Sequence, residues 1–183
     1  METKRKMSPA LFITQAAMIA AVYVVLTYFI AAFGLASGAI QVRISEALTI
    51  LPVFTPAAIP GLFVGCLLAN TLTGAVIWDI IFGSIATLLA AIMTYFLRGT
   101  KFLYTIPPVL TNAIIVPAVL IKAYGAEDAY WFLMITVAIG EIISVCGLGS
   151  LLRATLERYR GVIFKTDDDT VASSYKIRAK AQE

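Results

Sequence analysis

Residues 47–78 read ALTILPVFTPAAIPGLFVGCLLANTLTGAVIW, and this stretch decides how often the chain crosses a membrane. It has no charged residue over 32 positions, which is too long for one straight pass of about 20 residues and too short for two full ones. Pro52, Pro56 and Pro60 are four apart in its first half, and proline breaks a helix by removing a backbone donor. We therefore predict a short helix, a Pro-rich turn and a further helix over Ala57–Leu72.

The composition places this stretch in a membrane protein. Of the 183 residues, 60% are apolar and 14% are charged, whereas soluble domains average about 45–50% apolar and about 25% charged residues. Between Ser8 and Leu152 only nine charged residues occur, namely Arg43, Glu46, Asp79, Arg98, Lys101, Lys122, Glu127, Asp128 and Glu141. So few charges cannot form a water-exposed surface. The sequence therefore predicts an all-α, multi-pass protein of the cell membrane.

Several classes of chemistry are excluded by what is missing. The chain has no His, which rules out a His-ligated metal site and a Ser-His-Asp triad. Cys66 and Cys146 both lie in apolar runs and are typical of small buried residues rather than of a metal or disulfide pair. No Gly-rich phosphate loop is present. We expect no cofactor, no metal, no ATP hydrolysis by this chain and, because the net charge of +3 resides at the ends and in short loops, no nucleic-acid partner.

Four other apolar runs are long enough to cross the hydrocarbon core, namely Leu11–Phe33, Ile80–Leu97, Phe102–Ile121 and Ala129–Leu152. The first has no obvious cleavage site and is interpreted as a retained helix rather than a signal peptide. With the short second helix, which ends near Leu51, and the helix after it, the count is six transmembrane helices. We assign residues 1–160 to one membrane domain and residues 161–183 to a charged, disordered cytoplasmic tail.

The distribution of basic residues supports six passes. Cytoplasmic loops carry the excess of Lys and Arg, and Lys4, Arg5 and Lys6 therefore place the N-terminus inside. If residues 47–78 form two passes, the basic residues at 98 and 101 and those at 153, 158 and 160 are also cytoplasmic. A single pass would put both clusters outside. We thus expect cytoplasmic termini and external loops at Gly34–Gln41, Thr73–Trp78 and Lys122–Asp128.

Polar residues at membrane depth indicate a pocket that opens outward. Such residues are costly in lipid unless they are paired or face a wet cavity, and in this topology they lie at the midplane or in the outer half: Glu141, Asn112, Asn70, Asp79, Trp78, Arg43 and Glu46. Glu141 is the clearest candidate because a mid-membrane carboxylate needs a partner. The inner half has nothing comparable, which disfavours a continuous conduction path.

Several of these residues also have a plainer interpretation. Arg43 and Glu46 are three apart and could neutralise each other on one helix. Asp79 could cap the fourth helix. Asn112 could bond a carbonyl that Pro107 or Pro108 leaves free. The aromatic residues near the membrane surface could form an interface belt, namely Trp78, Tyr130 and Trp131.

Small residues on the first helix form one stripe, made of Ala16, Ala17, Ala20 and Ala21. Gly61, Gly65 and Ala69 have the same spacing in the third helix. Small residues let membrane helices approach closely. The pattern fits either packing within this chain or docking onto another membrane subunit.

A longer motif links the chain to a family. The run Gln41–Gly61, QVRISEALTILPVFTPAAIPG, resembles the signature of the queuosine-precursor transporters (QueT-type), as do Gly65–Asn70, GCLLAN, and Asp79–Ser84, DIIFGS. The resemblance extends from about Ser8 to Arg160. Such proteins are the substrate-binding (S) components of energy-coupling factor (ECF) importers, which are ABC-type transporters.

The resemblance implies a ligand and partners. The ligand is a 7-deazaguanine: the nitrile preQ0, the aminomethyl form preQ1 or queuine. The partners are a transmembrane coupling subunit, which docks on the Ala stripe of the first helix, and two cytoplasmic ATPases, which supply the work while the S component topples in the membrane.

Ligand chemistry suggests roles for the polar residues. Glu141 or Glu46 would accept the two adjacent N–H groups of the base, while Asn70 and Asn112 would orient it. Asp79 would lie near an aminomethyl group and Arg43 would act as a gate or bind an acceptor. A tryptophan would stack on the ring, with Trp78 and Trp131 as candidates.

Other functions stay open at this point. An S component for another flat heterocycle has the same composition. A stand-alone secondary transporter would normally have internal repeats and polar residues on both sides of the midplane. A small membrane enzyme would need a nucleophile and base or a metal set beside Glu141, Asp79 and Glu46. Dependence on ATPase partners separates these classes.

Overall fold

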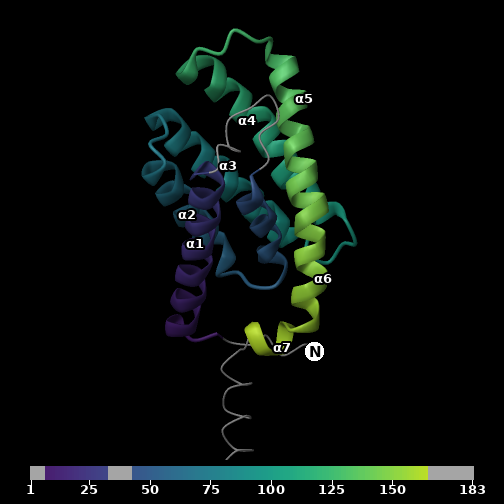
Figure 1. Cartoon of the computed structure of the whole chain (residues 1–183). Helices are drawn as coiled ribbons and strands as arrows, with labels where there is room; N and C mark the ends of the chain where they lie inside the picture. Colours follow the sequence, from purple (N-terminus) through teal and green to yellow (C-terminus); the bar gives the residue numbers. More distant parts are fainter. Residues whose placement is uncertain (1–6, 33–42, 165–183) are drawn as a thin grey trace, which may run out of the picture.

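The computed structural model describes residues 7–32 and 43–164, and every regular element in these ranges is a helix (Figure 1). In chain order they are α1 (Pro9–Ala32), η1 (Ile44–Val53), α2 (Ala58–Leu72), α3 (Ile77–Phe96), η2 (Leu103–Thr105), α4 (Ile106–Tyr124), α5 (Tyr130–Glu141), η3 (Ile142–Gly149), α6 (Ser150–Arg158) and α7 (Arg160–Ile163). Here η1 and η2 are 3-10 helices and η3 is a π-helix. The expected loop Gly34–Gln41 and residues 165–183 of the expected tail lie outside the described residues.

Within the described ranges, four helices are long and apolar enough to cross a membrane, namely Pro9–Ala32, Ile77–Phe96, Leu103–Tyr124 and Tyr130–Arg158. Two shorter apolar helices, η1 and α2, lie where the sequence predicted a short helix, a Pro-rich turn and a further helix. The all-helical class and the division of residues 47–78 into two helices at the Pro-rich turn are therefore confirmed. The count of six passes and the side of each terminus remain predictions.

Two boundaries differ from the sequence prediction in ways that affect the site. α3 begins at Ile77 rather than Ile80, which places Trp78 and Asp79 in its first turn. α4 continues to Tyr124, where Gly125 adopts the left-handed φ of +66° that ends the helix. Apolarity marked the membrane-buried part of each helix, whereas backbone hydrogen bonding continues into the more polar residues at its ends.

The turn after η1 is secured by side chains as well as by proline. The backbone N–H of Phe54 donates to Leu51 O at 2.9 Å. The hydroxyl of Thr55 donates to Oε1 of Gln15 in α1 at 2.8 Å and accepts from the N–H of Ala57 at 3.3 Å. The Pro-rich turn is thereby joined to the first helix.

α1 and α2 pack through small residues. A Cβ atom added at Gly61 would lie 2.7 Å from the carbonyl oxygen of Ala16, and one at Gly65 would lie 3.0 Å from the Cα of Ala20. The two backbones therefore approach more closely than any side chain larger than hydrogen would permit. Ala17 and Ala21 lie on the other side of α1 and are exposed. The Ala stripe is thus divided between an inner and an outer face.

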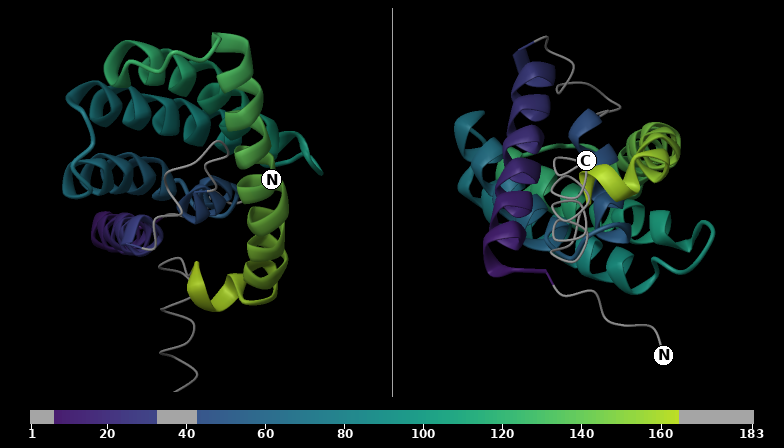
Figure 2. Two further views of the ribbon diagram at one scale, coloured as in Figure 1. Left: turned by 45° about the horizontal axis from the view of Figure 1, so that its top comes forward. Right: turned by 90° about the horizontal axis from the view of Figure 1, so that it is seen from below.

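The short helix η1 lies inside the bundle, and every residue from Ser45 to Pro52 is buried. It packs against α1, α3 and η3, and Figure 2 shows it among the longer helices. A Cβ at Gly149 would lie 3.1 Å from Cγ2 of Ile50, so the glycine lets η3 approach η1. This arrangement brings the charged start of η1 into the interior.

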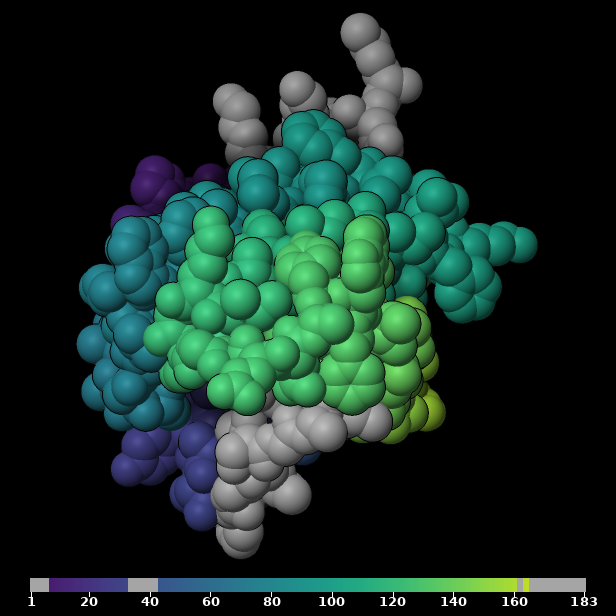
Figure 3. All heavy atoms as spheres, turned by 90° about the horizontal axis from the view of Figure 1, so that it is seen from above, coloured from purple at the N-terminus to yellow at the C-terminus, as the bar shows by residue number. Residues whose placement is uncertain are grey.

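The C-terminal third forms a long helical rod of α5, η3 and α6 along one side of the bundle (Figure 1). When the molecule is seen from above, α4 and the start of α5 cover the middle of the visible face (Figure 3). At the opposite end the chain continues past α6 into α7, and Phe164 stacks on Phe54 with ring centroids 5.1 Å apart. Phe164, which was assigned to the tail, therefore contacts the Pro-rich turn.

Candidate functional site

A polar cavity of about 450 Å³ lies where five segments meet: the end of α1, the start of η1, the end of α2, the start of α3 and the end of α4. Its lining residues are Thr27, Ile30, Ala31, Arg43, Ile44, Ser45, Asn70, Thr73, Gly74, Ala75, Asp79, Leu120 and Tyr124. Three predicted site residues, Arg43, Asn70 and Asp79, therefore share one cavity although they come from different helices.

An ion pair crosses this cavity. Nη2 of Arg43 lies 4.0 Å from Oδ2 of Asp79. The Tyr124 hydroxyl donates to the same oxygen at 3.1 Å and accepts from the N–H of Val76 at 3.3 Å. The Arg43 side chain is 25% exposed and that of Asp79 is 9% exposed. A pair at this distance is loose enough for the guanidinium to gain a further acceptor without losing its counter-charge.

Asn70 is held beside this ion pair. Its Nδ2 donates to the backbone oxygen of Asp79 at 3.4 Å and to Sγ of Cys66 at 3.6 Å. A Cβ at Gly83 would lie 3.2 Å from both Asn70 Nδ2 and Asp79 Oδ1. The glycine leaves the space that these two polar groups occupy.

A second set of polar side chains joins four segments. The Tyr23 hydroxyl of α1 donates to Oε1 of Glu46 in η1 at 2.5 Å. Nδ2 of Asn112 in α4 lies 3.4 Å from Oε2 of Glu46 and 2.9 Å from Oε1 of Glu141, the last residue of α5. These four side chains, which we call the carboxylate cluster, are between 1% and 7% exposed. Two carboxyl groups 95 positions apart in the sequence are thus linked through one amide.

The hydrogen-bonding capacity of the carboxylate cluster is not filled. Oε2 of Glu141 is buried and has no partner, and the same holds for Oγ of Ser45 and Oγ of Ser144. Ser45 precedes Glu46 and lines the polar cavity, whereas Ser144 follows Glu141 by three positions in η3. Buried polar groups are normally paired, so these three unpartnered atoms along the contact between η1 and η3 are unusual.

The backbone is also unusual here. The π-helix η3 begins at Ile142, directly after Glu141. π-helical turns are rare and occur frequently at functional sites. The local change of helical pitch falls at the carboxyl group whose second oxygen has no partner.

The surroundings of the two carboxyl groups are neutral over the described residues. Within the described residues no group of three or more His, Cys, Asp and Glu is placed to hold a metal. In the same ranges no Lys or Arg nitrogen lies within 4.0 Å of Glu46 or Glu141. The unpartnered Oε2 of Glu141 can accept an N–H donor.

The plainer interpretations of three polar residues do not match these contacts. Arg43 pairs with Asp79 rather than with Glu46. Asp79 is in the first turn of α3, where the N-cap is Val76 and has no side-chain cap bond. The carbonyl oxygens of Pro107 and Pro108 accept from the Thr111 hydroxyl at 2.8 and 3.3 Å. Asn112 instead bonds the two carboxyl groups.

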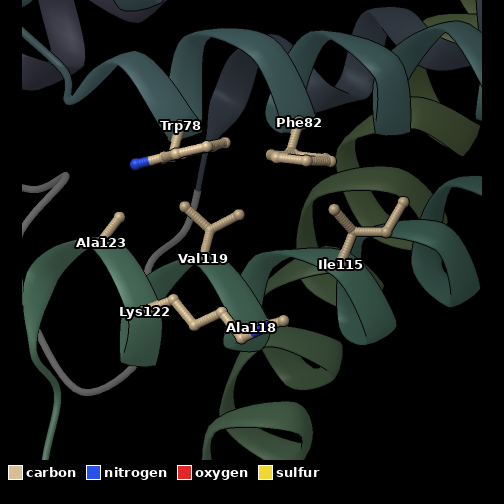
Figure 4. A pocket seen from close by; sticks show the side chains of 7 residues that line it. All are labelled: Trp78, Phe82, Ile115, Ala118, Val119, Lys122 and Ala123. Carbon is tan, nitrogen blue, oxygen red and sulfur yellow. The ribbon is translucent and has the colours of Figure 1, made fainter.

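The tryptophans lie elsewhere. Trp78 is 54% exposed, Trp131 is 68% exposed, and neither lines the polar cavity. Trp78 stacks on Phe82 in a groove of about 460 Å³ between α3 and α4, where the two rings face the side of α4 that carries Ile115, Val119 and Ala123 (Figure 4). These positions fit the interface-belt interpretation, since indole rings favour the boundary between lipid and water.

Two site residues escaped the sequence analysis. Tyr23 follows Ala16 by seven positions, which places it on the inner face of α1 with Ile19 and Ala20, and this periodicity was available in the sequence. Tyr124 lies beyond Lys122, where the apolar run had been taken to end. No sequence signal placed either hydroxyl beside a carboxyl group.

Comparison with known proteins identifies a family. A family model described as QueT transporter matches residues 13–158. No curated protein and no solved structure gives a significant match. The matched range contains every residue of the polar cavity and of the carboxylate cluster.

Proposed function

The chain belongs to the QueT transporter family, and on this basis we propose that it is the substrate-binding S component of an ECF importer for a queuosine precursor. It is a multi-pass membrane transporter. In the proposal, the substrate is a 7-deazaguanine, and ATPase partner subunits supply the energy for uptake.

The observation that carries this proposal is the carboxylate cluster. A deazaguanine edge presents two adjacent N–H donors, from N1 and the 2-amino group, and one carboxylate can accept both. Oε2 of Glu141 is buried and unpartnered, while Oε1 has a single donor, Asn112. In our proposal Glu141 accepts the base edge, and Asn112 and Glu46 hold it in position.

The polar cavity supplies the remaining groups. Arg43 would donate to the ring carbonyl, for which the loose 4.0 Å pair with Asp79 leaves capacity. Asp79 would attract an aminomethyl group, and Asn70 beside it would orient the substituent. Trp78 and Trp131 are not assigned to ring stacking in this proposal, because both side chains are exposed on the surface of the helix bundle.

We further propose that the outer face of α1 contacts the coupling subunit. Ala17 and Ala21 are exposed on this face, whereas Ala16 and Ala20 contact α2. A flat strip between larger exposed residues such as Met18 and Val25 would let a partner helix approach closely.

Equilibrium binding to the purified chain in detergent tests the substrate. We expect a queuosine precursor to bind with submicromolar Kd, and guanine and riboflavin to bind weakly. Glu141→Gln should weaken binding about 10- to 100-fold, since a hydrogen bond to a charged group contributes about 1.5–3 kcal/mol. Glu127→Gln, in the exposed loop after α4, is the matched control and should bind like the wild type.

The outcomes separate the parts of the proposal. Binding that survives in Glu141→Gln would move the base edge to Glu46 or Asp79. Absence of binding to every deazaguanine by folded protein would overturn the substrate. Accumulation of substrate by vesicles that contain this chain alone would overturn the S-component assignment in favour of a secondary transporter.

A further inference from the structure

The carboxylate cluster has too little counter-charge for two ionised groups. Glu46 and Glu141 share one neutral donor nitrogen, Nδ2 of Asn112, at 3.4 and 2.9 Å. Both side chains are at most 7% exposed. Arg43 attracts both groups, but its ion pair is with Asp79. Two buried like charges without a cation of their own are strongly unfavourable, and a buried group in this position normally becomes neutral. The empty protein must therefore hold a proton here.

The contacts indicate which carboxyl group is ionised. Glu46 accepts at both oxygens, from Tyr23 and from Asn112. The 2.5 Å separation between Tyr23 and Glu46 is at the short end of the range for a hydroxyl bonded to a carboxylate, about 2.5–2.7 Å. Glu141 has one donor, and its Oε2 has none. The negative charge is therefore better supported on Glu46, and the proton belongs to Glu141.

The other charged and titratable groups around the cluster do not replace this proton. α1 contributes Tyr23, which already donates to Glu46, and α2 contributes the Cys66 thiol. Arg43, just before η1, attracts both carboxyl groups, but its ion pair is with Asp79 of α3. α4 and η3 contribute neutral groups, Asn112 and Ser144.

We propose that Glu141 is protonated in the empty protein and that it loses this proton when the aminomethyl deazaguanine binds, because the ammonium group of that ligand brings in the positive charge that the proton supplied. The inference rests on the proposed function, since it concerns the same substrate. The O–H bond of Glu141 breaks, the proton leaves to water, and the carboxylate formed accepts the hydrogen bond from the ligand. The ligand itself is chemically unchanged.

Proton exchange has a definite pH signature. Because binding releases a proton, acid competes with the substrate. Affinity therefore rises with pH, by up to about tenfold per unit, wherever Glu141 is protonated in the empty protein and ionised in the complex. A site that only accepts hydrogen bonds from an already ionised group would lack this dependence.

Titration calorimetry with the cationic aminomethyl deazaguanine tests the exchange, and the neutral nitrile, which should release much less than one proton, is the matched control ligand. Binding is measured at one pH in two buffers of different ionisation enthalpy, which yields the number of protons released. We expect close to one proton for the wild type and for Glu127→Gln, and none for Glu141→Gln at ligand concentrations that still saturate it. A heat that does not depend on the buffer in the wild type, or an unchanged proton release in Glu141→Gln, would overturn the proposal.

The empty protein is tested without any ligand. Infrared spectroscopy at neutral pH should show the C=O stretch of an un-ionised carboxyl group in the wild type and in Glu127→Gln, and should not show it in Glu141→Gln. In the wild type this band should also vanish as the pH is raised, because Glu141 then ionises. This second measurement does not require the variant to fold. Absence of the band overturns the protonation even if deazaguanines bind. Presence of the band without binding of any deazaguanine supports the proton on Glu141 and overturns the proposed substrate.

Discussion

Asn112 joins two carboxyl groups that are far apart in the sequence, and this single contact organises the interior. Its Nδ2 bonds Oε1 of Glu141 at 2.9 Å and lies 3.4 Å from Oε2 of Glu46. Thr111, the preceding residue, bonds only carbonyl oxygens of its own helix. Adjacent polar residues of α4 thus have different partners. Thr111 bonds the backbone of its own helix, whereas Asn112 bonds the carboxyl groups of the carboxylate cluster.

This difference predicts the effects of two neighbouring substitutions. Asn112→Leu removes the donor that both carboxyl groups share, and each buried polar group left unpartnered costs about 1–3 kcal/mol. We expect a clearly lower Tm in detergent and loss of substrate binding. Thr111→Val should lower stability by less than about 1.5 kcal/mol and leave binding intact. Equal effects of the two substitutions on Tm and binding would contradict the bridging role of Asn112.

At the scale of helices, α1 has two faces with different surroundings. The inner face contacts α2 where Gly61 and Gly65 leave no room for larger side chains. The outer face, with Ala17 and Ala21, is exposed in this chain. One stripe of alanines in the sequence therefore becomes two surfaces, because successive residues on a helix point about 100° apart.

Substitutions on the two faces should separate folding from coupling. Ala20→Leu would force apart backbones that lie close together at Gly65, and we expect a loss of about 1–3 kcal/mol in stability. Ala17→Leu combined with Ala21→Leu should leave Tm and substrate binding unchanged but prevent co-purification with the coupling subunit and uptake by the full importer. Normal uptake by the double variant would rule out docking through this outer face.

At the scale of the whole molecule, the short helices matter most. η1 is buried among the longer helices, and its first turn carries Ser45 and Glu46 into the interior. The polar cavity and the carboxylate cluster lie on the two sides of this turn, with Ser45 lining the cavity. A helix too short to cross the hydrocarbon core on its own thereby supplies Glu46 to the carboxylate cluster and Ser45 to the polar cavity.

Cysteine labelling tests the six-pass topology. Cys66 and Cys146 are first replaced by Ala, and a single cysteine is introduced at Glu127 or at Lys101. With six passes and a cytoplasmic N-terminus, an impermeant thiol reagent should label Glu127→Cys in intact cells and Lys101→Cys only after permeabilisation. Labelling of Lys101→Cys from outside would require an odd number of passes before it and would overturn the two-pass hairpin.

Much of the architecture follows from local sequence properties. The long apolar runs predicted the spanning helices, because lipid requires about 20 apolar residues with all backbone groups bonded internally. The three prolines predicted the break between η1 and α2. The family motif identified the same family that the match over residues 13–158 shows. These conclusions depend on hydropathy, residue type and short spacings, all of which the chain displays directly.

Other features depend on which helices become neighbours. Depth in the membrane selected Arg43, Asn70 and Asp79, which share the polar cavity, and Trp78 and Trp131, which do not line it. Hydropathy gives the depth of a residue but not the direction in which its side chain points, so the tryptophans and the alanine stripe could not be assigned to a face. The link from Tyr23 to Glu46, Asn112 and Glu141 exists only after four helices have packed. The sequence alone thus determined a helical membrane transporter with buried charge, and the tertiary structure decided which charges meet, because partners in a helix bundle are chosen by packing rather than by distance along the chain.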